Sequence, residues 1–76
     1  MLDQIELPSA IESERAILGL ILLDNSLCDQ VRRELTADWF YAESHKQIFR
    51  AMLALDKQKQ PIDGITVGDE LNRYGE

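Results

Sequence analysis

The chain has 76 residues and a net charge of −6, and 45% of its residues are hydrophobic. This length allows one domain with a thin core, and the apolar content excludes a disordered chain. The excess of acidic residues repels phosphate, so we expect no direct binding of nucleic acid by this chain.

The N-terminal sequence MLDQIELPSA lacks the basic and apolar regions of a secretory signal. The apolar run AILGLILL, residues 16–23, is far shorter than the ~20 residues that a membrane-spanning helix needs. Cys28 is the single cysteine, which excludes an internal disulfide. We therefore expect a cytoplasmic protein without a membrane segment.

Residues 8–23 are predicted to form the first helix. Ser9 and Glu12 have the spacing of a capping box, and Glu12 and Glu14 place negative charge in the first turns, where the helix dipole favours it. The shortage of β-branched residues argues against a buried strand. Residues 16–23 are apolar all round, and a helix of this kind is surrounded on all sides.

A short second helix is expected to start at Ser26, which is the predicted cap, and to end at Thr36-Ala37-Asp38. Its apolar positions are Leu27, Cys28, Val31 and Leu35. The aromatic triplet Trp39-Phe40-Tyr41 follows in a connector. Because no basic residues are interleaved with it for stacking on bases, we expect the triplet in the core. Cys28 is expected to be a small buried hydrophobe rather than a reactive thiol.

Ser44 and Gln47 have capping-box spacing at the start of a third helix. The apolar face of that helix consists of Ile48, Phe49, Met52 and Leu55. After a loop at residues 60–64, Thr66 and Asp69 suggest the start of a last helix. That helix would carry Val67, Leu71 and Tyr74 and would stop at Gly75. The predicted fold is therefore an all-α bundle of four helices.

A basic stripe runs along the third helix. Lys46, Arg50 and Lys57 lie on one side of it, next to Leu53. Charged stripes are ordinary on amphipathic helices, so a solvated face explains this pattern. The alternative is contact with an acidic surface of a partner. Lys46, Arg50, Leu53 and Lys57 are therefore the candidate partner interface.

Reactive groups are scarce. One His and one Cys cannot supply the usual zinc ligands, and the glycines form no phosphate-binding loop. We expect no catalytic, cofactor-binding or metal-binding residue in this chain, and no binding of ATP. His45 is expected to pack or hydrogen-bond locally in the first turn of the third helix. A small hydrolase that uses His45 is an alternative without partner residues to support it.

Several short motifs follow one another in a fixed order. They are Pro8, Ile11-Glu12 with Glu14, Ile17-Leu18-Gly19, Leu22 to Asn25, Asp38 with Phe40-Tyr41, His45 with Ile48-Phe49, Met52, Leu55, Pro61-Ile62-Asp63, Thr66 and Leu71. In order and spacing, this series resembles the N-terminal domain of DnaB-type replicative DNA helicases. The resemblance implies a helical head at residues 8–76 after an N-terminal extension at residues 1–7.

The resemblance also implies a function. In this family the head precedes a helical hairpin and a RecA-like ATPase that uses ATP and Mg²⁺. Neither is present in these 76 residues, so the chain looks like a non-catalytic fragment that needs no cofactor. Six heads, paired as a trimer of dimers, form a collar on the helicase ring, and primase docks on that collar. The expected partners are thus a second copy of the chain and primase.

Two further points bear on this expectation. Gly64 and Gly68 stand around the last helix where the family has larger residues, so we expect that helix to be frayed or to start late. The three other helices are too few to cover both sides of residues 16–23, so we expect exposed apolar surface and a symmetric dimer. The alternative function is an unrelated acidic helical adaptor that binds a partner helix in an apolar groove.

Overall fold

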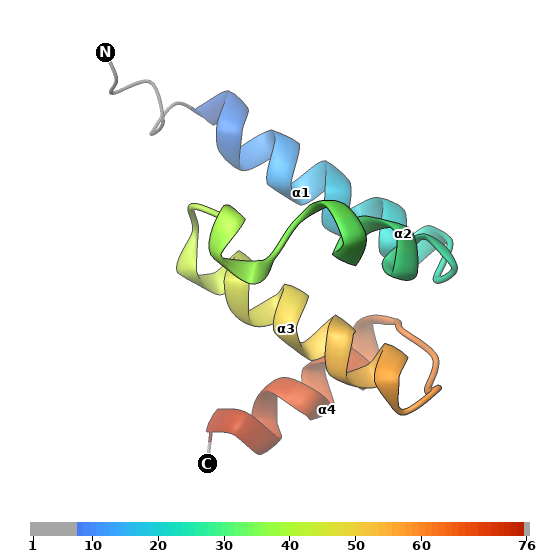
Figure 1. Ribbon diagram of the computed structural model, residues 1–76. Coiled ribbons are helices and arrows are strands. Elements are labelled where there is room, and N and C mark those ends of the chain that lie inside the picture. The colour runs from blue at the N-terminus through green and yellow to red at the C-terminus, as the bar shows by residue number, and fades with distance from the viewer. Residues whose placement is uncertain (1–7, 76) are drawn as a thin grey trace.

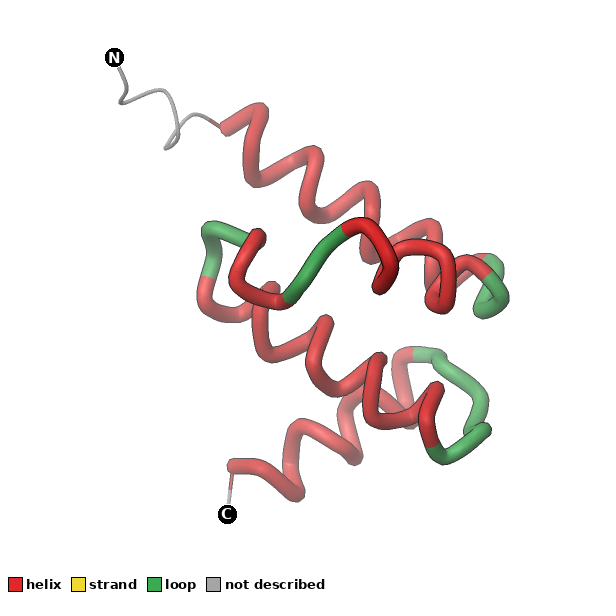
Figure 2. Tube along the Cα trace, in the orientation of Figure 1, coloured by secondary structure: helices red, strands yellow, loops and turns green. Residues whose placement is uncertain are grey.

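The computed structural model describes residues 8–75, and its regular structure within that range is entirely helical (Figures 1 and 2). The elements are α1 (Pro8–Leu23), α2 (Leu27–Glu34), the short 3-10 helix η1 (Ala37–Trp39), α3 (Glu43–Lys57) and α4 (Gly64–Gly75). The prediction of four helices in an all-α fold is confirmed. The predicted extension, residues 1–7, and the side chains of Ser9 and Tyr74 lie outside the described part of the chain.

Helix α3 is the centre of the bundle. It packs against α1, α2, η1 and α4, and Figure 1 shows it between α1 and α2 on one side and α4 on the other. The buried apolar core consists of Leu18, Ile21, Cys28, Phe40, Phe49, Ala51, Met52, Leu55, Ile62 and Val67. Because α3 supplies more of these residues than any other element, every other element depends on its position.

The second half of α1 is not surrounded. Leu18 and Ile21 are buried against the core, but Leu20 is 52% exposed and Leu23 is 85% exposed. The prediction that residues 16–23 are covered on all sides is therefore wrong. The reason is that α1 packs on α2 and α3 only along one side. The expectation that four helices leave one side of this run uncovered is confirmed.

The aromatic triplet is only partly in the core. Phe40 is 1% exposed, but Trp39 is 48% and Tyr41 is 52% exposed, so the prediction holds for Phe40 alone. Phe40 has extended backbone at the end of η1, and consecutive side chains of an extended chain point to different sides. The Phe40 ring centroid lies 5.1 Å from that of Phe49. Trp39 meets Phe40 edge-on at the same centroid distance.

Two of the predicted helix caps differ in the structure. The Ser26 hydroxyl does not cap α2 but donates a 2.6 Å hydrogen bond to Asp24 Oδ1. Helix α4 begins at Gly64, because Asp63 Oδ1 accepts 2.9 Å hydrogen bonds from the N–H groups of Ile65 and Thr66. Thr66 Oγ1 accepts from the N–H of Asp63 in return. This capping box lies three residues before the predicted one, and the expected late start of α4 is wrong.

The Asn25 side chain links the turn between α1 and α2 to the loop between α3 and α4. Asn25, in the turn between α1 and α2, donates through Nδ2 to the carbonyl oxygens of Ile21 and Ile62, both at 2.9 Å. Its Oδ1 accepts from the N–H of Ile62 at 2.8 Å. The side chain therefore ties the end of α1 to the loop before α4, 37 residues away in the chain.

Replacing Asn25 with Ala should lower the free energy of unfolding by about 2 kcal/mol, because it leaves the N–H and C=O groups of Ile62 without their partner. Urea unfolding followed by circular dichroism measures this change. Asn72→Ala, at an exposed position of α4, is the matched control and should alter stability by less than about 0.5 kcal/mol. Equal effects of the two substitutions would contradict the structural role of Asn25.

Candidate protein-binding surface

The basic stripe predicted from the sequence lies along one side of α3, but the structure divides it in two. Lys46 is half-buried in the first turn of the helix, and Arg50 is exposed with its guanidinium 3.7 Å from the Asp38 carboxylate. Leu53 and Lys57 lie in the second half of α3, where they line a hollow beside α2. The structure therefore brings two of the four predicted interface residues together in one concave site.

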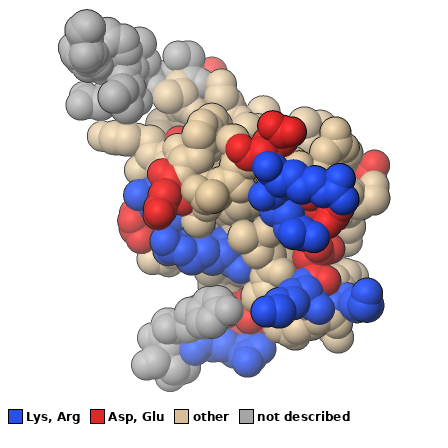
Figure 3. Space-filling model, in the orientation of Figure 1, with Lys and Arg blue, Asp and Glu red and all other residues tan. Residues whose placement is uncertain are grey.

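The hollow between α2 and the second half of α3, here called the α2–α3 hollow, has a volume of about 900 Å³. It is lined by Asp29, Arg32, Leu35, Thr36, Ala37, Leu53, Asp56, Lys57 and Lys59. Leu35, Ala37 and Leu53 are half-buried, whereas the three basic side chains are exposed. In Figure 3, Lys and Arg side chains gather over α2 and the end of α3 on this face of the molecule.

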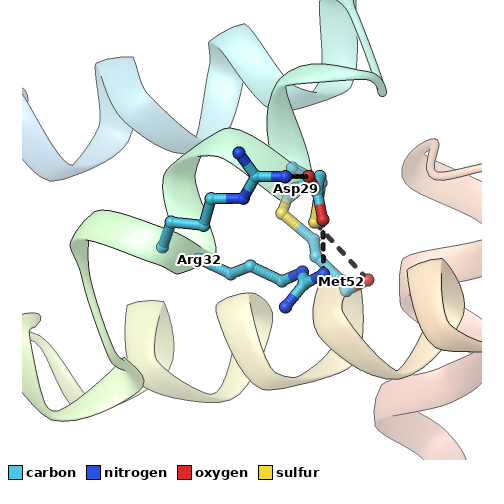
Figure 4. Close-up of polar contacts among 5 residues, drawn as sticks. Asp29, Arg32 and Met52 are labelled. Atoms are coloured by element: carbon cyan, nitrogen blue, oxygen red, sulfur yellow. Dashed lines mark hydrogen bonds and ion pairs between the residues drawn. The ribbon is translucent and has the colours of Figure 1, made fainter.

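Asp29 is the centre of a small charge network on α2. Its carboxylate accepts a hydrogen bond from Arg32, and its second oxygen accepts one from Arg33 at 2.7 Å. Figure 4 shows the Asp29 carboxylate beside Arg32, over Met52 of α3. These pairs are largely exposed, so they contribute little to stability. They do neutralise part of the negative charge at the hollow.

A second depression, the α1–α2 groove, lies between the first two helices and has a volume of about 340 Å³. It is lined by Ile17, Leu20, Leu27, Gln30, Val31, Glu34 and Leu35. The predicted apolar residues of the second helix therefore fall into two groups, one in the core and one along this groove. Cys28 is fully buried in the core, whereas Leu27, Val31 and Leu35 are half-buried along this groove.

His45 and Glu14 form a buried polar contact between α3 and α1. His45 Nδ1 lies 2.8 Å from Glu14 Oε1, and the side chain of Glu14 is 4% exposed. His45 lies in the first turn of α3 and packs edge-on against Phe40, as expected, but its hydrogen-bond partner is not local and lies 31 residues away. Of the two acids predicted to place charge in the first turns of α1, Glu12 is exposed, but Glu14 is buried.

Glu14 also accepts hydrogen bonds from the backbone that leads into α3. The Glu14 carboxylate accepts hydrogen bonds from the N–H groups of Tyr41 at 2.5 Å and Ala42 at 3.3 Å, just before α3. Ala42, the N-cap residue of α3, has no side-chain oxygen, and no side-chain cap involving Ser44 and Gln47 forms. The sequence offers only an indirect signal for this role, since a helix start without its own cap needs an acceptor from elsewhere.

The hydrogen bonds decide the ionisation of Glu14. Burial alone raises the pKa of this carboxyl group, but the N–H of Tyr41, the ring of His45 and the N–H of Ala42 outweigh burial and lower the pKa below its ordinary value of 4.5. Burial also raises the pKa of the Cys28 thiol, and there it prevails, so the pKa is raised to about 11. The prediction of Cys28 as a small buried hydrophobe is confirmed.

The comparisons with known proteins identify the family. The sequence profile described as "DnaB-like helicase N terminal domain" matches residues 6–76. The chain belongs to this family. This membership confirms the resemblance to the N-terminal domain of DnaB-type helicases that the motif series indicates. It also excludes the alternative of an adaptor unrelated to that family. No solved structure matches the chain with significance.

Relatives in the family carry the name of a replicative helicase. "Replicative DNA helicase DnaB" of Buchnera aphidicola subsp. Baizongia pistaciae is 39% identical over 93% of this chain and 15% of that protein. The protein of the same name from Rhodothermus marinus is 39% identical over 91% of this chain and 7% of its own length. "Replicative DNA helicase DnaC" of Bacillus subtilis is 42% identical over 84% of this chain and 14% of that protein.

The chain therefore spans between 7% and 15% of the length of these relatives. Within residues 8–75, no cluster of three His, Cys, Asp or Glu side chains is placed to hold a metal ion. The helices that the structure describes are all too short or too polar to cross a membrane. Among the residues that the structure describes, the α2–α3 hollow and the α1–α2 groove are surface depressions that a ligand could occupy.

Replacing Glu14 with Gln should lower the free energy of unfolding by about 2 kcal/mol at pH 7, because a neutral amide is a poorer acceptor and brings its own N–H toward other donors. A carboxyl group with a lowered folded-state pKa stabilises the fold above its unfolded pKa. That contribution is lost as pH falls through the folded-state pKa. The difference between wild type and Glu14→Gln should therefore shrink as pH falls below 4.5.

Urea unfolding at pH values between about 5 and 3 measures this difference across the expected window. Glu12→Gln is the control, since Glu12 is exposed on the same helix and its substitution should change stability by less than about 0.5 kcal/mol. A pH-independent difference between wild type and Glu14→Gln would show that the carboxylate charge does not stabilise the fold.

Proposed function

We propose that this chain acts as the non-catalytic N-terminal domain of a replicative DNA helicase, in which it supports assembly of the ring and docking of primase. The observation that carries the proposal is the family match over residues 6–76, together with relatives named as replicative helicases. In this proposal the domain needs no cofactor of its own. ATP and Mg²⁺ would be used by a separate motor domain of the helicase.

Exposed apolar surface on α1 and α2 supports the assembly role. Leu20 and Leu23 are more than half exposed, and Leu20 also lines the α1–α2 groove. Fully burying one Leu side chain contributes ~1.5–3 kcal/mol. A symmetric dimer covers the same surface on both copies with a single type of contact. We therefore propose that this surface mediates pairing of two domains.

The double substitution Leu20→Glu and Leu23→Glu should weaken dimer formation at least about tenfold, because it places charges in an apolar contact. Folding should persist, since both side chains are largely exposed. Sedimentation equilibrium over a range of concentrations measures the association, and circular dichroism measures the fold.

Ile65→Glu is the matched control for this pair, because Ile65 is a 77% exposed apolar residue on α4. It should leave the dimer unchanged. A wild-type chain that stays monomeric at all accessible concentrations would rule out pairing through this surface, as would equal loss of association in the control.

The basic side of α3 supports the docking role. Arg50 and Lys57 are exposed cations on a chain whose net charge is −6, so they are suited to an acidic partner surface. Within residues 8–75, Arg50 pairs with the largely exposed Asp38, a contact that water screens. We therefore propose that primase contacts this side of α3.

The double substitution Arg50→Glu and Lys57→Glu should weaken primase binding at least about tenfold, since it juxtaposes like charges at the contact. The fold should be unchanged, because both side chains are exposed. A pull-down with primase and circular dichroism of the same variant decide the question. Arg15→Glu, an exposed charge reversal on α1, is the control and should leave primase binding intact.

A further inference from the structure

The α2–α3 hollow combines an apolar floor with a basic rim. Its apolar residues Leu35 and Leu53 are half-buried and come from different helices. Its basic residues Arg32, Lys57 and Lys59 are exposed at the edges. A partner helix that docks in a groove places apolar side chains at helical spacing on the floor and charged side chains at the rim. The hollow has both parts of such a site.

The rim keeps positive charge available even though the chain as a whole is acidic. Among the described residues, no carboxylate lies within ion-pair distance of Lys57 or Lys59. Asp29, the acid on the α2 side, already accepts hydrogen bonds from Arg32 and Arg33. An incoming carboxylate would therefore meet lysines that have no competing partner in residues 8–75.

The backbone at Lys59 points to the same site. Helix α3 ends in a Schellman motif, in which Gln60 N–H donates to the Leu55 carbonyl at 2.9 Å and Lys59 N–H donates to the Asp56 carbonyl at 3.0 Å. This motif places Lys59 at φ 59°, a left-handed conformation that favours glycine. The fold alone favours Gly at this position, whereas Lys supplies a cation to the rim.

The charged and apolar residues that line the hollow restrict the kind of ligand that can bind there. Asp56 lines it together with the cations, and Asp29 is paired with Arg32 and Arg33, so the hollow lacks the uniformly positive charge that favours a densely charged phosphate chain. The apolar floor also requires apolar groups, which a small anion lacks. We propose that the α2–α3 hollow binds an acidic amphipathic helix of a partner protein. This inference deepens the proposed docking function and rests on it for the biological occupant.

The test uses a fluorescent 15-residue amphipathic peptide with leucines on one face and glutamates on the flanks, and a second peptide with lysine in place of each glutamate. Fluorescence anisotropy with the 76-residue chain should show saturable binding of the acidic peptide below about 100 μM and much weaker binding of the basic one. Lys57→Glu combined with Lys59→Glu should weaken acidic-peptide binding at least about tenfold.

Lys59→Gly separates binding from folding. Glycine fits the left-handed backbone, so the urea midpoint of this variant should equal or exceed that of the wild type. Its affinity for the acidic peptide should nevertheless fall about threefold or more, because the rim loses a cation. Arg15→Glu, on α1, is the control and should leave acidic-peptide binding unchanged.

The outcomes separate the two proposals. Equal binding of both peptides, or acidic-peptide binding that Lys59→Gly leaves unchanged, overturns the assignment of the hollow, and so does Lys59-dependent dimerisation of the chain. Primase is then assayed with the same variants. A wild-type chain that binds primase but not the acidic peptide refutes the assignment of the hollow but not the docking function. Loss of acidic-peptide binding with intact primase binding in the Lys57→Glu/Lys59→Glu variant supports the hollow and shows that primase docks elsewhere. Acidic-peptide binding without any primase binding refutes the docking function but supports the hollow.

Discussion

The buried carboxylate of Glu14 is the contact on which the arrangement of this domain depends. It comes from α1 and accepts the N–H groups of Tyr41 and Ala42 as well as a hydrogen bond with His45. A charge of this kind is costly to bury, and only several hydrogen-bond donors make its burial tolerable. The contact therefore fixes where the connector after η1 ends, in which direction α3 begins and how α1 lies against it.

The two surface depressions follow from that arrangement. Because α3 is fixed against α1 at its start, its second half faces α2 and leaves room for the hollow that Leu35 and Leu53 line. Because α1 and α2 each give one side to the core, their remaining apolar residues meet along the α1–α2 groove. One depression is rimmed by cations and the other is almost wholly apolar. The same small bundle therefore presents two chemically different faces, suited to different partners.

Helical periodicity was enough to predict the number of helices, the core face of α3 and the burial of Cys28, because these features depend on residues three or four positions apart. It failed where the partner is distant in the chain. Glu14 is indistinguishable from Glu12 by local pattern, yet only Glu14 meets the start of α3. The basic stripe along α3 was predicted from helical spacing, and its role as a partner interface stays a prediction. The division of the stripe by the hollow was not predicted, since that depends on α2 and on the backbone at Lys59.

The hydrogen bonds between the Asn25 side chain and the Ile62 backbone affect which amino-acid substitutions this fold tolerates. Its side-chain amide forms hydrogen bonds with the backbone of Ile62, so this contact does not depend on which side chain stands at position 62. Any apolar residue that fills the same buried space preserves the contact, whereas position 25 needs both a donor and an acceptor. Aspartate lacks the donor and leucine lacks both. A substitution at position 62 would therefore not compensate for one at position 25. Correlated sequence changes at the two positions would not reveal this contact.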